Sequence, residues 1–131
     1  MTADRVGLGR RGETLATEAL QAEGFVLVDR NWRCPYGEVD LVVARGADLY
    51  FIEVRTRRTL SAPSPEQTLT PRKLTHMENT ARAYLGAHDT RADSTWHLSF
   101  VAVTMDRGGR VRRITFYPDL DGDPVDLLRR A

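Results

Sequence analysis

The chain has 131 residues, 41% of them hydrophobic and 28% charged, and its formal net charge is +1. This length suits one domain with its own core, and the balanced charge neither indicates nor excludes a nucleic-acid partner. Cys34 is the only cysteine, no apolar run approaches the roughly 20 residues of a membrane span, and no secretory signal is visible, so we expect a cytoplasmic chain with no disulfide framework, no Cys-based zinc site and no membrane partner.

The first predicted element is a helix over 13–23, where leucines and alanines recur at helical spacing and Gly24 suits the C-terminal stop. After it we predict a strand over 25–30, a connection over 31–35, and two arms of a β-hairpin over 36–44 and 49–57.

Two possible helix starts follow the hairpin. Ser64-Pro65-Glu66-Gln67 has the form of a capping box, and Thr70-Pro71 offers a second start for an amphipathic helix that ends near Gly86. The remaining segments are predicted as strands over 96–105 and 111–117 and as a short helix or a loose tail over 119–131. The order α-β-β-β-α-β-β predicts one α/β domain over 1–131, with a core of about 9–117, a tail over 118–131, and helices packed on a sheet.

The hairpin contains acidic residues inside the apolar stretch GEVDLVVARGADLYFIEVRTR, residues 37–57. Because side chains alternate across a strand, Glu38 and Asp40 are expected on one face of the first arm, opposite Val39, Leu41 and Val43. The residues expected to share one face of the second arm are Phe51, Glu53, Arg55 and Arg57, opposite Tyr50, Ile52 and Val54.

A turn of even length at Gly46-Ala47 places Asp40 directly opposite Glu53, whereas a turn of odd length does not. Cross-strand neighbours stand about 5 Å apart at Cβ, so like charges there repel. A shared proton, an Arg or Lys side chain, or a divalent metal ion would relieve the repulsion. Oxygen ligands suit Mg²⁺ or Mn²⁺, and a metal held this way is the arrangement that phosphodiester hydrolysis needs.

Glu13 is a candidate for a third carboxylate at this site. It lies at the start of the predicted helix and shares part of its core-facing stripe with Ala16 and Leu20. The alternative is that Glu13 only complements the helix dipole.

Several strings together resemble the YraN family of small bacterial proteins: GRRGE, RNWR, GEVDLVV, YFIEVRTR, TPRKL and ARAYL. That family belongs to the PD-(D/E)xK nuclease-like superfamily, akin to Holliday-junction resolvases. The resemblance implies a restriction-endonuclease-like αβββαβ core, with a mixed sheet flanked by helices. It also implies a metal-dependent endonuclease that acts on nucleic acid, with DNA expected, and such chemistry commonly uses a homodimer.

The resemblance assigns roles to individual residues of this chain. It implies that Asp40 and Glu53 bind Mg²⁺ or Mn²⁺ together with the backbone carbonyl of Val54, and that Glu13 assists them. Glu38, in the same string as Asp40, is a candidate for a supporting ligand.

The chain departs from the superfamily pattern at Arg55, which stands where the pattern has lysine. Arginine cannot lose its proton in a protein, although it can hold a phosphate or stabilise negative charge. Lys73, the only lysine, is a candidate for a lysine relocated to the following helix; the alternative is an ordinary solvent-facing residue. Ser99 and Ala62 also differ from the family, which usually has an aspartate and a glycine at these places.

Basic residues near the acidic stretch are candidates for phosphate contact, with ordinary surface charge as the alternative; they are Arg57, Arg58, Arg72 and Lys73. Three functions therefore stand open. The first is a nuclease, the second is a catalytically weak or inactive nucleic-acid-binding module with Arg55 in place of lysine, and the third is a protein-interaction scaffold in which the acidic pair serves only structure.

Overall fold

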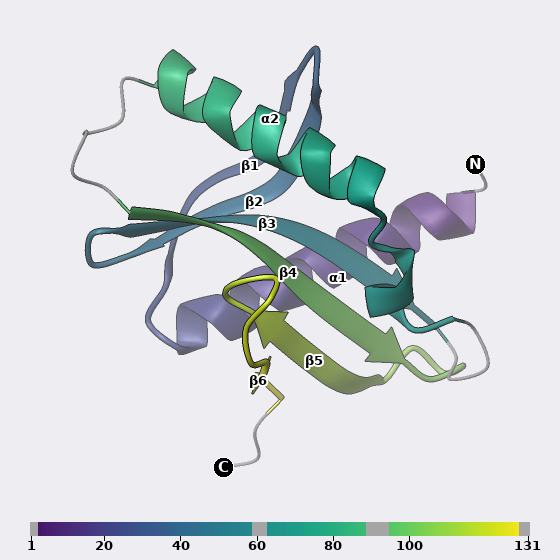
Figure 1. Cartoon of the computed structure of the whole chain (residues 1–131). Helices are drawn as coiled ribbons and strands as arrows, with labels where there is room; N and C mark the ends of the chain where they lie inside the picture. Colours follow the sequence, from purple (N-terminus) through teal and green to yellow (C-terminus); the bar gives the residue numbers. More distant parts are fainter. Residues whose placement is uncertain (1–2, 59–62, 89–94, 129–131) are drawn as a thin grey trace.

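A mixed sheet forms the centre of the chain and has one long helix on each face, as Figure 1 shows. The computed structural model describes residues 3–58, 63–88 and 95–128, and the side chains from residue 7 onward within these ranges. The elements are α1 (Ala3–Ala22), β1 (Val26–Cys34), β2 (Gly37–Arg45), β3 (Asp48–Arg57), a short 3-10 helix η1 (Pro65–Thr68), α2 (Pro71–Ala87), β4 (Thr95–Met105), β5 (Val111–Tyr117) and β6 (Val125–Asp126).

The strands lie in the order β1-β2-β3-β4-β5-β6. Only β3 and β4 run parallel, and the crossover between them contains α2, because parallel neighbours cannot be joined by a tight turn. The other neighbours are antiparallel. The predicted α/β class, with a restriction-endonuclease-like mixed sheet flanked by helices, is confirmed.

Apolar residues form a separate core on each face of the sheet. Alternation along β3 divides them: Tyr50, Ile52 and Val54 face the larger core under α1, whereas Phe51 faces the smaller core under α2. The prediction for the two faces of β3 is therefore confirmed. Leu49 also packs on the α2 side, and Glu53 contacts Lys73 of α2.

The first helix begins ten residues earlier than predicted, at Ala3 rather than at Glu13. Gly7 and Gly9 lower the helix propensity of this segment, so the sequence pattern does not indicate a helix before Glu13. Packing overrides that local preference, since Leu8 lies against the core under α1. Glu13 consequently sits in the middle of α1, so the interpretation that it complements a helix N-terminus is wrong. No helix in the described ranges has the length and apolar character to cross a membrane.

The predicted connection over 31–35 is also wrong, because β1 continues to Cys34. The strand accommodates an irregularity between Leu27 and Asp29, where its register against β2 shifts. It also passes through Asn31, which has a left-handed backbone with φ of 53°. Asparagine is one of the few residues that adopt this conformation readily, so a strand continues where the sequence resembles a turn.

Both proposed helix starts after the hairpin are used. The Gln67 side chain accepts a hydrogen bond from the Ser64 N–H at the start of η1, and the Thr70 hydroxyl accepts from the Lys73 N–H at the start of α2. In the described part of the tail there is neither a helix nor a loose end: a turn leads to β6, which pairs with β5.

The contact between α1 and β3 predicts the effect of two glycine substitutions. A methyl group at Gly12 would overlap Thr56 Oγ1, and β-branched Thr56 has little rotamer freedom to withdraw. We expect Gly12→Ala to lower the free energy of unfolding by about 1–3 kcal/mol, the usual cost of overpacking. Gly9, where nothing lies within 4 Å of such a methyl group, is the matched control.

Urea denaturation of both variants tests this contact. Gly9→Ala should raise the free energy of unfolding by up to about 1 kcal/mol, the difference in helix propensity. Equal shifts in the two variants would show that α1 does not approach β3 closely at Gly12.

Candidate active site

The site is built where β2 and β3 separate. Their ladder runs from Arg45↔Asp48 at the turn to Leu41↔Ile52, which is the even-length turn that the predicted pairing of Asp40 with Glu53 requires. Beyond that pair, Asp40 Oδ2 accepts a hydrogen bond from the Val54 N–H at 2.8 Å. The Asp40 carboxylate therefore accepts the hydrogen bond that a β2 backbone carbonyl would accept if the ladder continued. The N–H and C=O of one strand residue point to the same side, so the Val54 carbonyl also faces this gap.

Asp40 is mostly buried and surrounded by other carboxylates. Burial and the negative charge of Glu53 raise its pKa from 3.8 to about 7, against the lowering effect of the Val54 N–H and with smaller contributions from Glu13 and Glu38. At neutral pH the group is thus near the midpoint between its neutral and charged forms. A carboxylate in this position favours the approach of a cation or the retention of a proton.

Glu53 is buried, with 7% of its side chain exposed, and it contacts a cation from each of two elements. Arg55 Nε lies 2.8 Å from Oε2, and Lys73 Nζ, on α2, lies 3.4 Å from Oε1. The Arg55 contact is an ion pair without a well-aligned hydrogen bond, since its buried N–H does not point at that oxygen. Lys73 is not the ordinary solvent-facing helix residue of the alternative interpretation, because its amine turns to the acidic site.

Glu13 and Glu38 approach the same gap from the α1 side, where Asn31 connects them. With its amide nitrogen turned toward them, Asn31 donates to Glu13 Oε1 at 3.1 Å and to Glu38 Oε1 at 3.0 Å. Arg33 Nε donates to the other oxygen of Glu38 at 3.0 Å. Burial raises the pKa of Glu13, and the charge of Glu38 adds to the rise while the Asn31 hydrogen bond opposes it.

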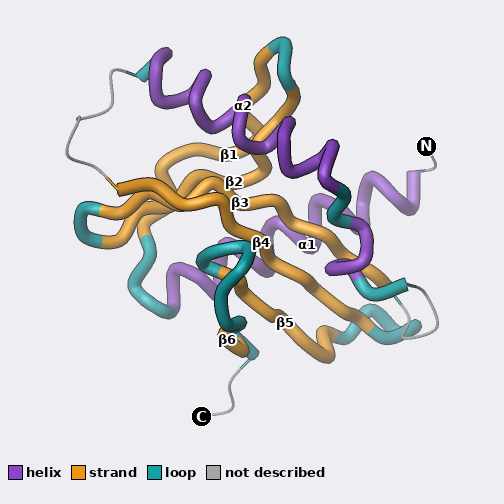
Figure 2. The backbone as a smooth tube through the Cα atoms, viewed as in Figure 1, coloured by secondary structure: helices purple, strands orange, loops and turns teal. Residues whose placement is uncertain are grey.

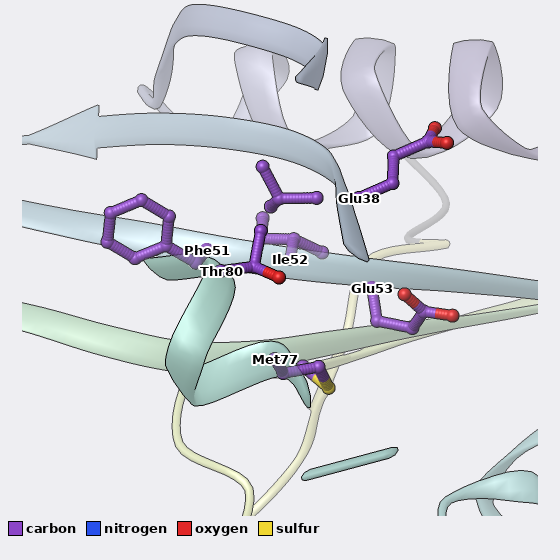
Figure 3. Close-up of a pocket in the computed structure, with 7 residues that line it drawn as sticks. Glu38, Phe51, Ile52, Glu53, Met77 and Thr80 are labelled. Atoms are coloured by element: carbon purple, nitrogen blue, oxygen red, sulfur yellow. The ribbon is translucent and has the colours of Figure 1, made fainter. Parts of the chain in front are cut away.

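The alternation predicted for β2 fails at one residue. Val39 belongs to the core under α2, whereas Leu41 and Val43 belong to the core under α1. The strand is free to rotate here because it has left the β3 ladder. Glu38 and Glu53 therefore extend to opposite sides of the sheet, as Figure 3 shows, and the negative charges of both add to the rise in the pKa of Asp40.

A small cavity adjoins Glu53 between the sheet and α2. Its volume of about 10 Å³ is the space of about one water molecule. The buried hydroxyl of Thr80 lines it and has no hydrogen-bond partner in the described part of the chain. The cavity therefore offers a polar position for one water molecule beside the Glu53 carboxylate (Figure 3).

The structure disperses the other predicted residues. Arg57 turns along the sheet, where its Nε donates to Thr104 Oγ1 at 3.1 Å, and Arg58 and Arg72 are exposed. Ser99 is buried and donates to the Pro118 carbonyl at 2.6 Å, so it joins β4 to the end of β5 and not to the carboxylates. Ala62 lies outside the described residues.

Comparison with known proteins gives a family for this chain. The family model described as "Uncharacterised protein family UPF0102" matches residues 12–110. The chain belongs to the UPF0102 family. A UPF0102 protein of Beutenbergia cavernae is 41% identical over 105 residues, covering 80% of this chain and 88% of its own length. A UPF0102 protein of Moorella thermoacetica is 38% identical over 111 residues, covering 85% and 92% of the two chains.

Membership of UPF0102 confirms the predicted resemblance, because UPF0102 is the YraN family. The match includes Glu13, Asp40, Glu53, Arg55 and Lys73 within residues 12–110. The printed descriptions of the family and of these relatives state no activity.

Asn31 is a site residue that sequence reasoning missed. It lies in the RNWR string of the UPF0102 resemblance, within the segment that the sequence pattern predicts as a connection. Its signal was available, because a conformationally tolerant asparagine before an aromatic residue indicates a special backbone position. The bridge to Glu13 and Glu38 depends on the length of α1 and β1, which the sequence pattern underestimated.

The raised pKa of Asp40 predicts an unusual pH dependence of stability without metal. Between about pH 4 and pH 7 the folded chain keeps a proton that the unfolded chain releases, so the free energy of unfolding falls as the pH rises through this window. Asp40→Asn keeps an oxygen for the Val54 N–H but cannot ionise. We expect this variant to be more stable than the wild type by on the order of 2 kcal/mol at about pH 8, and equally stable at about pH 4.

Thermal unfolding in a metal-chelating buffer measures this difference. Asp121→Asn, which removes an exposed carboxylate from the turn before β6, is the control and should change stability little at either pH. A wild type that becomes more stable between the two pH values, with Asp40→Asn less stable throughout, would contradict a raised Asp40 pKa.

Proposed function

We propose that this UPF0102 protein is a metal-dependent endonuclease that hydrolyses phosphodiester bonds of nucleic acid, with DNA as its substrate. The observation that carries the proposal is the gap between β2 and β3. There the half-buried carboxylate of Asp40, with its raised pKa, stands beside the buried carboxylate of Glu53, which contacts two cationic side chains. Such a concentration of perturbed and paired charges is typical of a catalytic centre.

The donor types fit Mg²⁺ or Mn²⁺. Asp40, Glu53 and the Val54 carbonyl offer oxygen ligands around the same gap, and Glu13 reaches it from α1. In the ranges that the structure describes, no three Asp, Glu, His or Cys side chains stand close enough to hold a metal ion as they lie. Binding thus requires Glu53 to exchange at least one of its cationic contacts for the metal. A bound metal would polarise the phosphate and lower the pKa of a water molecule.

Lys73 and Arg55 have different tasks in this proposal. Lys73 is half-buried, with 29% of its side chain exposed, and its amine beside Glu53 is placed to donate hydrogen bonds that orient the attacking water. The guanidinium of Arg55 stabilises the negative charge that develops on the phosphate. In this proposal two residues share the role of the superfamily lysine: Lys73 orients the water, and Arg55 stabilises the charge on the phosphate.

Arg72, next to Lys73 in α2, and Arg58, just after the end of β3, are exposed and are available for contacts to phosphates away from the reacting one. Cutting both strands of a duplex would require a second copy of the chain, because one site attacks one strand. The chemistry at Asp40 and Glu53 depends neither on these arginines nor on a second copy of the chain.

A second candidate function follows from the same ion pairs. Because Arg55 and Lys73 neutralise Glu53 without any metal, the site also suits a protein that binds nucleic acid but cuts it slowly or not at all. Arg55→Lys separates the two functions. A steep rise in cleavage would identify a weakened enzyme, and no cleavage in either form would favour the binding module.

Cleavage of labelled single-stranded, duplex and branched DNA with Mg²⁺ or Mn²⁺ tests the first proposal. We expect Asp40→Asn to abolish metal-dependent cleavage, and Lys73→Ala to reduce it by about 10²–10³-fold, the usual cost of removing one positioned hydrogen-bond donor from a reaction centre. Arg82→Ala, which removes an exposed basic side chain of α2 that pairs with Glu78, is the control and should lose little activity. Cleavage that survives Asp40→Asn would overturn the proposed site.

Metal binding is measured separately by calorimetry and by the rise in melting temperature that a ligand of the folded state produces. The wild type should gain stability from Mn²⁺ and Asp40→Asn should not. If neither protein responds at millimolar metal, the oxygen-ligand proposal fails even where nucleic acid binds.

A further inference from the structure

A second hollow lies beside the candidate active site and has a different chemistry. Its volume is about 300 Å³, at the lower end of the range for small-molecule sites. The residues that line it are Glu66, Leu69, Leu74, Phe100, Tyr117 and Leu120. They come from η1, the segment after it, α2, β4, β5 and the turn before β6, whose arrangement Figure 2 shows.

The hollow and the carboxylate site share a wall. Phe100 stands in register with Glu53 on the neighbouring parallel strand, and neighbouring strands lie about 4.8 Å apart. Leu74, which lines the hollow, directly follows Lys73, whose Nζ lies 3.4 Å from Glu53 Oε1. A substrate whose phosphate reaches Glu53 and Lys73 therefore has the hollow immediately beside that phosphate.

The lining combines aromatic and apolar surface with one oriented carboxylate. The rings of Phe100 and Tyr117 lie 6.0 Å apart with an interplanar angle of 44°. The Tyr117 hydroxyl donates to Glu66 Oε2 at 2.8 Å and fixes that side chain. Glu66 Oε1 makes no hydrogen bond within the described residues, so it remains a free acceptor at the edge of an apolar pocket.

We propose that this hollow binds one unpaired nucleobase that carries an exocyclic amino group, next to the phosphate at the carboxylate site. The proposal rests on the proposed function and names its substrate class. The flat face of a base suits the aromatic and leucine lining. Glu66 Oε1 accepts from the amino group, as carboxylates do from cytosine N4, whereas thymine and uracil have no such group.

This occupant restricts the substrate. In a duplex the base is stacked and its amino group is engaged in pairing, so entry into the hollow requires a single strand or an extruded base. We therefore assign to the chain a preference for single-stranded or mispaired segments over continuous duplex.

Equilibrium binding tests the pocket independently of turnover. Fluorescence anisotropy with labelled oligo(dC), oligo(dT) and a fully paired hairpin, at one salt concentration and with Ca²⁺ in place of Mg²⁺, gives the three affinities. We expect oligo(dC) to bind about tenfold more tightly than oligo(dT), the factor for a hydrogen bond to a charged group, and the hairpin to bind more weakly than oligo(dC).

Variants assign the preference to the hollow. Glu66→Gln should remove the preference for oligo(dC), because its amide offers a donor as well as an acceptor. Glu78→Gln removes an exposed carboxylate of α2 that pairs with Arg82, and it should keep the preference. Leu120→Trp fills the hollow and should weaken oligo(dC) binding while circular dichroism stays unchanged; if this variant unfolds, Glu66→Gln alone decides.

The outcomes separate this inference from the proposed nuclease. Base preference that depends on Glu66, in a protein that never cuts, would support the pocket and overturn catalytic turnover. Metal-dependent cleavage with equal affinity for oligo(dC) and oligo(dT) would overturn the pocket and leave the nuclease standing. Failure to bind any of the three nucleic acids would overturn the pocket, leaving the hollow to an apolar side chain of a protein partner.

Discussion

The rest of the structure depends on the hydrogen bond from the Val54 N–H to Asp40 Oδ2, at 2.8 Å. This bond satisfies the backbone of β3 after β2 has left the ladder, and so makes a gap in the middle of a sheet tolerable. The gap admits Glu13 and Glu38 from the α1 side and Glu53 from the α2 side. These carboxylates repel one another, and their partial burial strengthens the repulsion. A bound proton or cation would therefore stabilise the group.

Side chains of the protein itself stabilise some of these carboxylates. Arg55 and Lys73 contact Glu53, and Asn31 donates to Glu13 and Glu38. Asp40, by contrast, accepts a hydrogen bond from the neutral Val54 N–H, and no cation pairs with it among the residues that the structure describes. The positive charges of the site are thus placed at Glu53 and not at Asp40. Burial, together with the negative charge of Glu53, raises the pKa of Asp40 to about 7, while Glu53 itself contacts two cations. A buried pair of like charges has this outcome when cations reach only one of the two.

The sequence predicted the features that follow from local patterns. The even turn at Gly46-Ala47 and the alternation along β3 were sufficient to bring Asp40 to the level of Glu53. The length of α1, the continuation of β1 through Asn31 and the rotation of β2 at Val39 depend on packing between distant segments, which local propensity does not report. The contact of Lys73 with Glu53 joins α2 to β3 across the α2 crossover, so only the folded chain reveals which of its basic residues reaches the acid.

The most direct test of the cation site is a crystal structure of the protein soaked in Mn²⁺, with the anomalous signal of manganese used to locate the ion. A site formed by these carboxylates predicts an anomalous peak in the gap between β2 and β3, coordinated by Asp40, Glu53 and the Val54 carbonyl, with Arg55 or Lys73 withdrawn from Glu53. The contradicting result is a well-ordered site without such a peak, in which Arg55 and Lys73 both remain paired with Glu53. In that case the carboxylates are balanced by the chain's own cations alone.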